Sequence, residues 1–185
     1  MKIVFLDRDG VINKDPGFGG YVTCWEEFQF LPRALKALRK LNQAGYKTII
    51  ISNQAGVAKG LYTLEDLDEI TKNMLDEIKK AGGEICSVHY CPHKDEDNCS
   101  CRKPKTGLFS QALRGSSIDF SKTYFIGDHS RDMLAGKSIG CKTIFVLSGN
   151  TRLEDLDVQP DFVAKDLLEA VESIVLKDEN LDCIC

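Results

Sequence analysis

The sequence predicts an α/β fold in which helices cover both faces of a mostly parallel sheet. Short apolar runs alternate with longer helical patterns along nearly the whole chain. The run YKTIIIS at 46–52 is apolar on both faces, which is typical of a strand buried inside a parallel sheet. At 185 residues the chain has room for one domain with a full core.

The expected elements follow from apolar runs and from their start and stop signals. The first helix has a proline at its start and Gly45 just past its end. The second helix begins at Thr63, with Asp66 three residues on as a weak capping pattern. This alternation is that of a Rossmann-like three-layer sandwich. Strands are expected at 2–6, 46–52, 85–90, 123–126 and 143–147, and helices at 32–44, 63–81, 107–114, 130–139 and 166–176.

Charge and hydropathy exclude several classes of function. The net charge of -4 argues against nucleic-acid binding, which usually requires a basic patch. The N-terminal apolar run, Ile3 to Leu6, is too short for a signal peptide. No stretch approaches the ~20 apolar residues that a membrane span needs. We therefore expect a cytoplasmic protein without nucleic-acid or membrane partners, whose cysteines are reduced unless they bind metal.

Polar residues cluster where the predicted strands end. Asp7 and Asp9 follow the first strand, Ser52 and Asn53 close the second, and Asp128 follows the fourth. In open parallel sheets, ligands bind beyond the carboxyl ends of the strands. This convergence predicts a single site at that edge and has more weight than any one of the motifs.

The residue types at this edge suit phosphate chemistry. Asp7 and Asp9, at i and i+2 of an extended chain, project to one side, so one could attack phosphorus while the other delivers a proton. An isolated Asp-x-Asp is more often a solvated turn, and Ser52 could equally be a turn or helix cap instead of a phosphate ligand. Asp128 could complete an oxygen shell for magnesium. Asp132 could orient it, or could simply be a favourable acid in a first helical turn.

Two further segments supply cations and a metal-ligand pattern. The run Arg102-Lys103-Pro104-Lys105 offers positive charge for a transferring phosphoryl group, although basic loops are often merely solvated. It follows a segment that we call the cysteine loop, residues 91–101. Three thiols and one imidazole there form a complete tetrahedral set for structural zinc, with unligated surface thiols as the alternative. The expected zinc ligands are Cys91, His93, Cys99 and Cys101.

Taken together, these segments resemble the haloacid dehalogenase superfamily. DRDG at 7–10 is similar to its first motif, ISN at 51–53 to its second, RKPK at 102–105 to its third and GDHSRD at 127–132 to its fourth. Their order and spacing match over nearly the whole chain. With the cysteine loop, they resemble the group of heptose bisphosphate and histidinol phosphate phosphatases.

The resemblance implies a role for each motif residue. Asp7 would be the nucleophile and Asp9 the general acid and later base, while Ser52 and Lys103 would hold the phosphoryl group. Mg²⁺ would be bound by the Asp7 side chain, the Asp9 backbone carbonyl and Asp128. A second set would contact substrate: Asp15, Asn53, Gln54, Arg102 and His129, the last standing where the heptose enzymes often have a lysine.

The resemblance leaves the substrate open between two esters. The segments 20–22, 27–30 and 53–60 resemble heptose bisphosphate phosphatases, whereas five residues between His93 and Cys99 is the short spacing of histidinol phosphatases. We expect hydrolysis of the 7-phosphate of D-glycero-D-manno-heptose 1,7-bisphosphate, with histidinol phosphate as the alternative. A zinc-stabilised phosphate-binding module without catalysis is the remote third reading.

The resemblance also sets the expected organisation. Residues 1–176 would form the phosphatase domain, and 177–185 a flexible tail. No segment is long enough for a separate cap domain, so the loop 15–21 and the cysteine loop would be the walls of an open site. A small phosphorylated metabolite would be the partner, and a monomer is expected.

Overall fold

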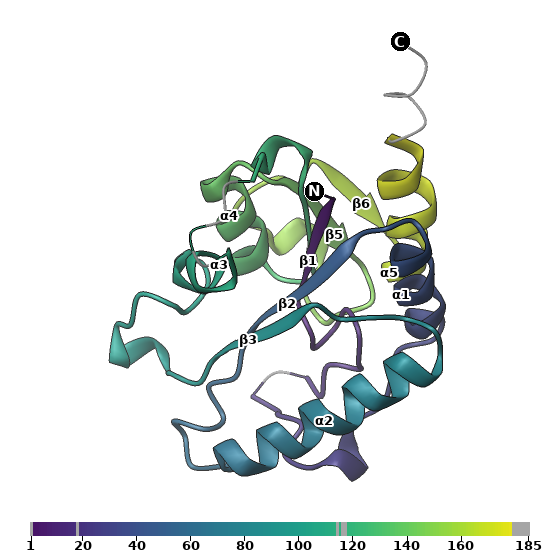
Figure 1. The fold of residues 1–185 in the computed structure, drawn as a ribbon. Helices are drawn as coiled ribbons and strands as arrows, with labels where there is room; N and C mark the ends of the chain where they lie inside the picture. The colour runs from purple at the N-terminus through teal and green to yellow at the C-terminus, as the bar shows by residue number, and fades with distance from the viewer. Residues whose placement is uncertain (1, 18, 114, 116–117, 179–185) are drawn as a thin grey trace.

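The computed structural model describes residues 2–17, 19–113, 115 and 118–178. Within these residues a six-stranded parallel sheet forms the centre, in the order β3-β2-β1-β4-β5-β6 (Figure 1). From β1 the chain adds β2 and then β3 on one side of the sheet. It then crosses to the other side of β1 and adds β4, β5 and β6, so β1 pairs with both β2 and β4. The strands are β1 (Ile3–Leu6), β2 (Lys47–Asn53), β3 (Ser87–Cys91), β4 (Tyr124–Gly127), β5 (Lys142–Val146) and β6 (Phe162–Ala164).

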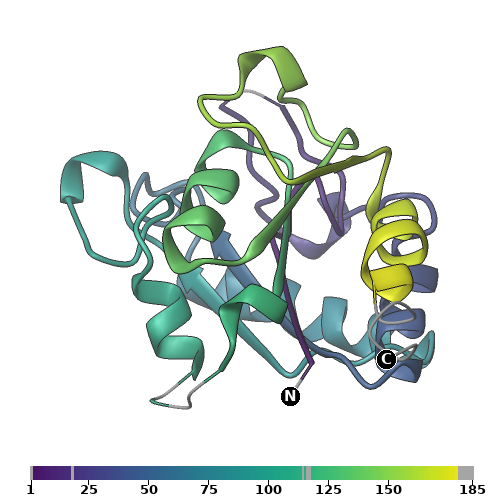
Figure 2. The same ribbon diagram turned by 90° about the horizontal axis from the view of Figure 1, so that it is seen from above.

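Helices cover both faces of this sheet, as the two views in Figures 1 and 2 show. One face packs against α1, α2 and α5, and the other against α3 and α4. The three-layer α/β prediction is therefore confirmed. The helices are α1 (Ala34–Gln43), α2 (Leu64–Lys80), α3 (Gly107–Leu113), α4 (Ser130–Ile139) and α5 (Leu167–Ala170), the last continued by a π-helical turn, Val171–Val175.

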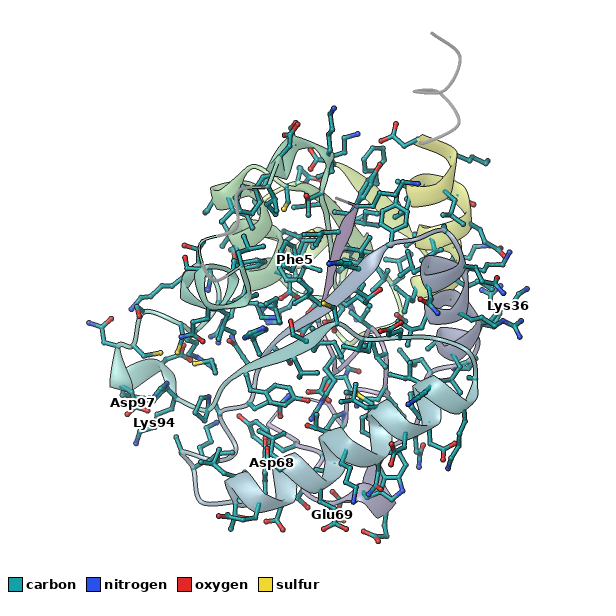
Figure 3. The ribbon with its side chains drawn as sticks, viewed as in Figure 1. Phe5, Lys36, Asp68, Glu69, Lys94 and Asp97 are labelled. Atoms are coloured by element: carbon teal, nitrogen blue, oxygen red, sulfur yellow. The ribbon has the colours of Figure 1, made fainter. Side chains whose placement is uncertain are left out.

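The spacing of apolar residues explains how these helices pack. In α1 the buried residues Ala34, Ala37, Leu38 and Leu41 follow the i, i+3, i+4, i+7 pattern of one helical face. All four residues of β1 are buried, as expected for a strand with a layer on each side. In Figure 3 Phe5 lies inside, whereas the charged side chains Lys36, Asp68, Glu69 and Asp97 lie at the surface.

Most predicted boundaries agree with the structure within two residues. The 63–81 helix begins after Thr63, whose hydroxyl accepts from the Asp66 N–H while Asp66 accepts from the Thr63 N–H, a complete capping box. The 32–44 helix starts two residues late, because Arg33 has a left-handed conformation with φ 69° and only caps it. Strand β6 was not predicted, because three residues are too few for a periodicity signal.

The C-terminal end of the domain is held by polar contacts. Lys177 and Asp178 remain helical, and Asp178 pairs with Lys142 and accepts a hydrogen bond from Tyr124. The rest of the predicted tail, 179–185, lies outside the described residues. Within the described part of the chain, every helix falls short of the length and apolar character that a membrane crossing requires.

Candidate active site

A cavity of about 180 Å³ opens at the carboxyl ends of β1, β2 and β4. Parallel strands all present their carboxyl ends at this edge, so residues far apart in sequence meet there. Most of the lining residues are polar or charged. Its residues are Asp7, Asp9, Asp15, Pro16, Gly20, Tyr21, Ser52, Asn53, Lys103, Asp128, His129, Arg131 and Asp132.

Lys103 is the cation at the centre of the site. Its Nζ lies 2.9 Å from Asp7 Oδ2 and 2.6 Å from Asp132 Oδ1, and it donates a 2.8 Å hydrogen bond to the Ile51 carbonyl. Its side chain is only 1% exposed. Burial alone would lower the pKa of Lys103, but the two carboxylates raise it above its usual range. The ammonium therefore stays charged in the interior, fixed directly behind the nucleophile candidate.

Asp7 combines burial with this ion pair. Burial raises the pKa of Asp7 to about 6, with repulsion from Asp132 in the same direction and the attraction of Lys103 opposing it. One of its oxygens accepts from the Arg8 N–H at 2.7 Å and the other faces Lys103. A carboxylate in this setting is poorly hydrated and aimed into the cavity, which suits attack on phosphorus once a cation stabilises its charge.

Asn53 fixes the segment that delivers Lys103. Its side-chain nitrogen donates to the Lys103 carbonyl at 3.1 Å, and its oxygen accepts from the Lys103 N–H at 3.0 Å. This amide pair ties the end of β2 to a loop fifty residues later. Asn53 also lines the cavity, so it combines a structural role with its predicted place at the substrate site.

Asp9, the proton-transfer candidate, is held by a buried polar network. Its Oδ1 accepts from Asn13 Nδ2 at 2.8 Å, its Oδ2 accepts from Gln54 Nε2 at 2.7 Å, and both oxygens accept from Arg8 Nη2 at 2.9 and 3.0 Å. Burial opposes its ionisation, but these partners together lower the pKa of Asp9. The guanidinium of Arg8 is completely buried, 6.0 Å from the ring centre of Phe28 and 5.7 Å from that of Tyr90.

Asp128 lies in crowded, anionic surroundings that suit a metal ligand. One carboxylate oxygen each from Asp7, Asp128 and Asp132 can lie within 4.8 Å of one another. Burial and then repulsion from Asp132 and Asp7 raise the pKa of Asp128 well above its usual range. A Cβ on Gly10 or Gly149 would lie 2.1 or 1.8 Å from Asp128 Oδ2, so only glycine fits on these two sides. Buried carboxylates that converge without a cation fit the hard oxygen ligation that Mg²⁺ prefers.

Of the two roles that the sequence left open for Asp132, the structure shows the one at the helix start, together with an ion pair to Lys103. Its Oδ2 accepts from the His129 N–H at 3.1 Å and completes a capping box at the start of α4. Its Oδ1 pairs with Lys103. Both oxygens of Asp132 are therefore engaged.

The rim of the cavity has its own charged cluster. Asp95, in the cysteine loop, receives Arg102 Nε at 2.8 Å and Arg131 Nη2 at 3.1 Å. Hydrogen bonds from Arg102 lower the pKa of Asp95 to about 2. Arg131 lines the cavity, and this shared carboxylate links α4 to the cysteine loop.

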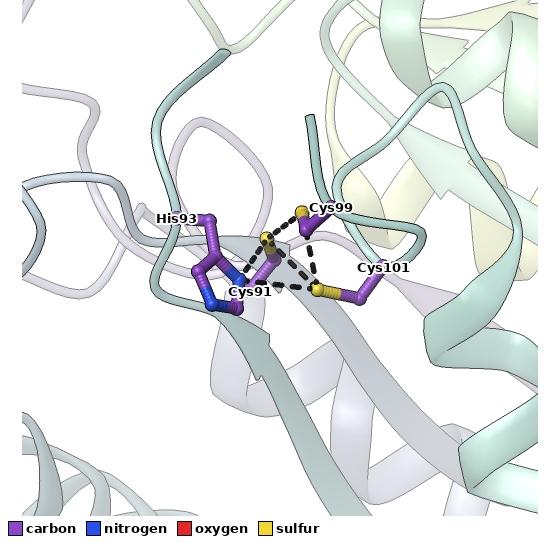
Figure 4. Close-up of side chains that lie close together, drawn as sticks. All are labelled: Cys91, His93, Cys99 and Cys101. Atoms are coloured by element: carbon purple, nitrogen blue, oxygen red, sulfur yellow. Dashed lines mark hydrogen bonds between the residues drawn. The ribbon is translucent and has the colours of Figure 1, made fainter. Parts of the chain in front are cut away.

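The four predicted zinc ligands converge on one point (Figure 4). Their Sγ atoms lie 3.2–3.6 Å apart, and His93 Nδ1 lies 3.7 Å from Cys91 Sγ and 3.4 Å from Cys101 Sγ. Tetrahedral zinc with bonds of about 2.0–2.3 Å requires ligand atoms roughly 3.4–3.8 Å apart. The set therefore fits zinc and leaves no ligand position for substrate.

The structure gathers most, but not all, of the predicted site residues at the cavity. Asp15 and His129 line it, with His129 exposed at the start of α4. Two predicted substrate contacts, Gln54 and Arg102, are not among the described residues that line the cavity. Gln54 is buried behind Asp9, and Arg102 lies at the outer rim with Asp95. The sequence also gave no signal for the burial of Arg8, since only the folded chain shows the rings and carboxylate that surround it.

Comparison with known proteins agrees with this geometry. Residues 100–170 match a family model described as HAD-hyrolase-like. The D-glycero-beta-D-manno-heptose-1,7-bisphosphate 7-phosphatase of Helicobacter pylori is 38% identical over 80% of this chain and 84% of its own length. The protein of the same name from Haemophilus ducreyi is 36% identical over 92% and 96%. The crystal structure of a D,D-heptose 1,7-bisphosphate phosphatase from B. bronchiseptica, complexed with magnesium and phosphate, covers 96% of this chain and 99% of its own, with 32% identity and a TM-score of 0.89.

Fold, site and relatives together define the class, a phosphoric monoester hydrolase on a haloacid dehalogenase fold. More closely, the chain belongs to the family of haloacid dehalogenase-like phosphatases that contains the heptose-1,7-bisphosphate 7-phosphatases.

Proposed function

We propose that this protein hydrolyses the 7-phosphate of D-glycero-β-D-manno-heptose 1,7-bisphosphate by way of a phospho-aspartate on Asp7. The observation that carries the proposal is the ion pair of Asp7 with the buried Lys103, 2.9 Å apart in a cavity that also holds Ser52, Asp9 and Asp128. The β anomer follows the names of the curated relatives, which are 34–38% identical to this chain over the aligned residues.

Mg²⁺ is the proposed catalytic cofactor, bound by Asp7, Asp128 and the backbone carbonyl of Asp9. When bound, it supplies a Lewis acid that screens the repulsion between an anionic nucleophile and an anionic phosphate. The converging buried carboxylates support this assignment, as does the magnesium in the homologous structure. Zinc in the cysteine loop is proposed to be structural, because four protein ligands complete its shell.

The side chains divide the reaction into two displacements. Asp7 attacks phosphorus while Ser52 and Lys103 hold the phosphoryl oxygens. Asp9 takes up a proton before this step, against the lowered pKa that its partners impose, and gives it to the departing O7 of the sugar. Asp9 then removes a proton from the water that attacks the acyl phosphate, which restores Asp7. Ser52 suits its role because it is 1% exposed at the end of β2, with its hydroxyl within 3.2 Å of Gln54 Nε2.

The second phosphate of the substrate is proposed to bind at the rim. Arg102 and Arg131 both donate to the Asp95 carboxylate there. Two guanidinium groups that converge on one anionic group can also attract the phosphate of a ligand. The sugar between the two phosphates would contact Asp15, Asn53 and His129, all of which line the cavity. A monomer remains a prediction.

Histidinol phosphate is the second candidate, on a single observation. Five residues separate His93 from Cys99, the short spacing expected of histidinol phosphatases. A non-catalytic phosphate-binding module is disfavoured, since Asp7, Asp9, Ser52, Lys103 and Asp128 are all present at one cavity.

The test is phosphate release with Mg²⁺ from both anomers of the heptose bisphosphate and from histidinol phosphate, with Asp7→Asn as the blank. We expect kcat/KM for the β anomer to exceed that for histidinol phosphate by ~100-fold or more, equivalent to about 2.7 kcal/mol of transition-state binding. A preference for histidinol phosphate would overturn the proposed substrate, and release by Asp7→Asn would overturn the nucleophile.

A further inference from the structure

A buried hydrogen-bonded chain leads from the second helix to the proton-transfer carboxylate. Tyr62, 6% exposed just before α2, donates from its hydroxyl to Gln54 Oε1 at 2.6 Å. Gln54, 1% exposed, donates from Nε2 to Asp9 Oδ2 at 2.7 Å and to Ser52 Oγ at 3.2 Å. One amide therefore joins the proposed acid to the hydroxyl that holds phosphate.

The chemistry of the neighbours fixes which way this amide points. Gln54 Oε1 faces two donors, the Tyr62 hydroxyl and Arg8 Nη2, the latter at 3.2 Å. In the flipped orientation the amide NH₂ would face the guanidinium, and its oxygen would face the Asp9 carboxylate, with donors opposed to donors and acceptors to acceptors. Arg8 and the Asp9 carboxylate thus fix the amide NH₂ toward Asp9, and the Tyr62 hydroxyl donates to the amide oxygen that this leaves facing it.

We propose that Tyr62 and Gln54 are positioning residues for proton transfer, which hold Asp9 in the orientation from which it protonates the leaving oxygen. This inference rests on the proposed phosphatase function and gives Gln54 a role behind Asp9 instead of the predicted contact with substrate. Arg8 and Asn13 hold Oδ1, and Arg8 also reaches Oδ2 at 3.0 Å, but the shortest hydrogen bond to Oδ2 is the one that Gln54 donates at 2.7 Å.

The hydrogen-bonded chain from Tyr62 to Asp9 requires a glycine at one nearby position. A Cβ on Gly56 would lie 2.2 Å from the ring of Tyr62, so the turn after β2 closes on that ring only with glycine at this position. A buried phenol hydroxyl could also exist merely to satisfy its own hydrogen bond. The experiment must therefore separate positioning from simple structural support.

The dependence on the leaving group provides that separation. A sugar alkoxide needs a proton as it departs, whereas the p-nitrophenolate and acetate leaving groups are stable without one. Because kcat/KM reports the steps up to leaving-group departure, Tyr62→Phe is expected to lower kcat/KM for heptose bisphosphate about fivefold, the scale of one lost hydrogen bond. Gln54→Leu is expected to lower it about 100-fold. For p-nitrophenyl phosphate and acetyl phosphate we expect a change of less than about twofold in Tyr62→Phe. Gln54→Leu also loses the hydrogen bond to Ser52 Oγ, so it is expected to lower kcat/KM for all three substrates, and most for the sugar ester.

Tyr90→Phe is the matched control. It also removes one phenol hydroxyl beside Arg8, but that hydroxyl contacts Thr71 Oγ1 at 3.0 Å and not Gln54. We expect this variant to show no difference between the substrates. Equal losses on all substrates for Tyr62→Phe, or an unchanged kcat/KM for the sugar ester, would overturn the inference. Failure of the wild-type enzyme to cleave any sugar phosphate would instead overturn the proposed function.

Discussion

The active-site residues come from two regions, the ends of the central strands and the loop that contains Lys103, and these regions are stabilised in different ways. Asp7, Ser52 and Asp128 stand at the ends of buried strands, whose backbone is satisfied by parallel pairing on both sides. Lys103 comes from a loop with little core of its own, just after the cysteine loop. Cys91 and Cys101 of the cysteine loop are buried at the core, and the rest of that loop is held by the converging ligands and by ion pairs of Asp95.

The two regions meet at the end of β2. Asn53 pairs with Cys91 in the β2–β3 register and also clamps the backbone of Lys103. The Gln54 N–H donates to the Cys91 carbonyl at 2.7 Å. The sheet thus supplies the carboxylates and the loop supplies the cation, so a mutation in one should affect activity and stability differently from a mutation in the other.

The largest expected loss of activity comes from mutating Asp7, at the end of a central strand. Asp7→Asn removes the nucleophile and should lower phosphate release by about 10⁴-fold or more, a loss on the scale seen when a catalytic residue is removed. Zinc content and secondary structure should stay at wild-type values, because the cysteine loop is untouched. Circular dichroism and metal analysis on the same sample check this. A parallel loss of zinc would mean that the two regions are not separable.

The cysteine loop should respond in the opposite way. Cys101→Ser removes one of the four ligands, and we expect loss of bound zinc and about 3 kcal/mol or more of stability. For a chain of this size that lowers Tm by roughly 6–12 °C. Cys86→Ser, at an exposed thiol outside the cluster, is the matched control and should change neither zinc content nor Tm. An unchanged Tm in Cys101→Ser would contradict the proposal that zinc stabilises the fold.

The junction between the two regions should give an intermediate effect. Asn53→Ala removes both hydrogen bonds to the Lys103 backbone and should lower kcat/KM by roughly 10–100-fold, since a small misplacement of a catalytic group is costly. Asn42→Ala, which removes an exposed hydrogen bond to the Gly82 carbonyl, is the control. If both variants kept wild-type kcat/KM, the clamp would be unnecessary for Lys103.

The smallest effect is expected at the rim. Arg131→Met should raise KM for the heptose bisphosphate about tenfold with little change in kcat, because the second phosphate contributes binding and not chemistry. KM for a sugar monophosphate should stay the same. Arg152→Met, at an arginine 77% exposed and paired only locally with Glu154, provides the control. Equal effects on both substrates would place the second phosphate elsewhere.

The sequence predicted the site residues at the strand ends better than the buried side chains that surround them. Strands and their ends are local features, so Asp7, Ser52 and Asp128 could be assigned to one edge from apolar runs alone. The zinc ligands also form a local pattern. The burial of Arg8 and the contact of Tyr62 with Gln54 depend on partners from separate segments, and no spacing rule encodes them. Strand β6 was missed because Phe162–Ala164 is too short to show a period.

The central claim, covalent catalysis through Asp7, is tested most directly by acid-quenching the enzyme during turnover of the heptose bisphosphate and locating phosphate by peptide mass spectrometry. The account predicts phosphate on the peptide that contains Asp7 in the wild-type enzyme, and none in Asp7→Asn. Phosphate bound to another residue would contradict it. So would an unmodified Asp7 in Asp9→Asn given acetyl phosphate, whose leaving group needs no proton although hydrolysis of the acyl phosphate still needs the base.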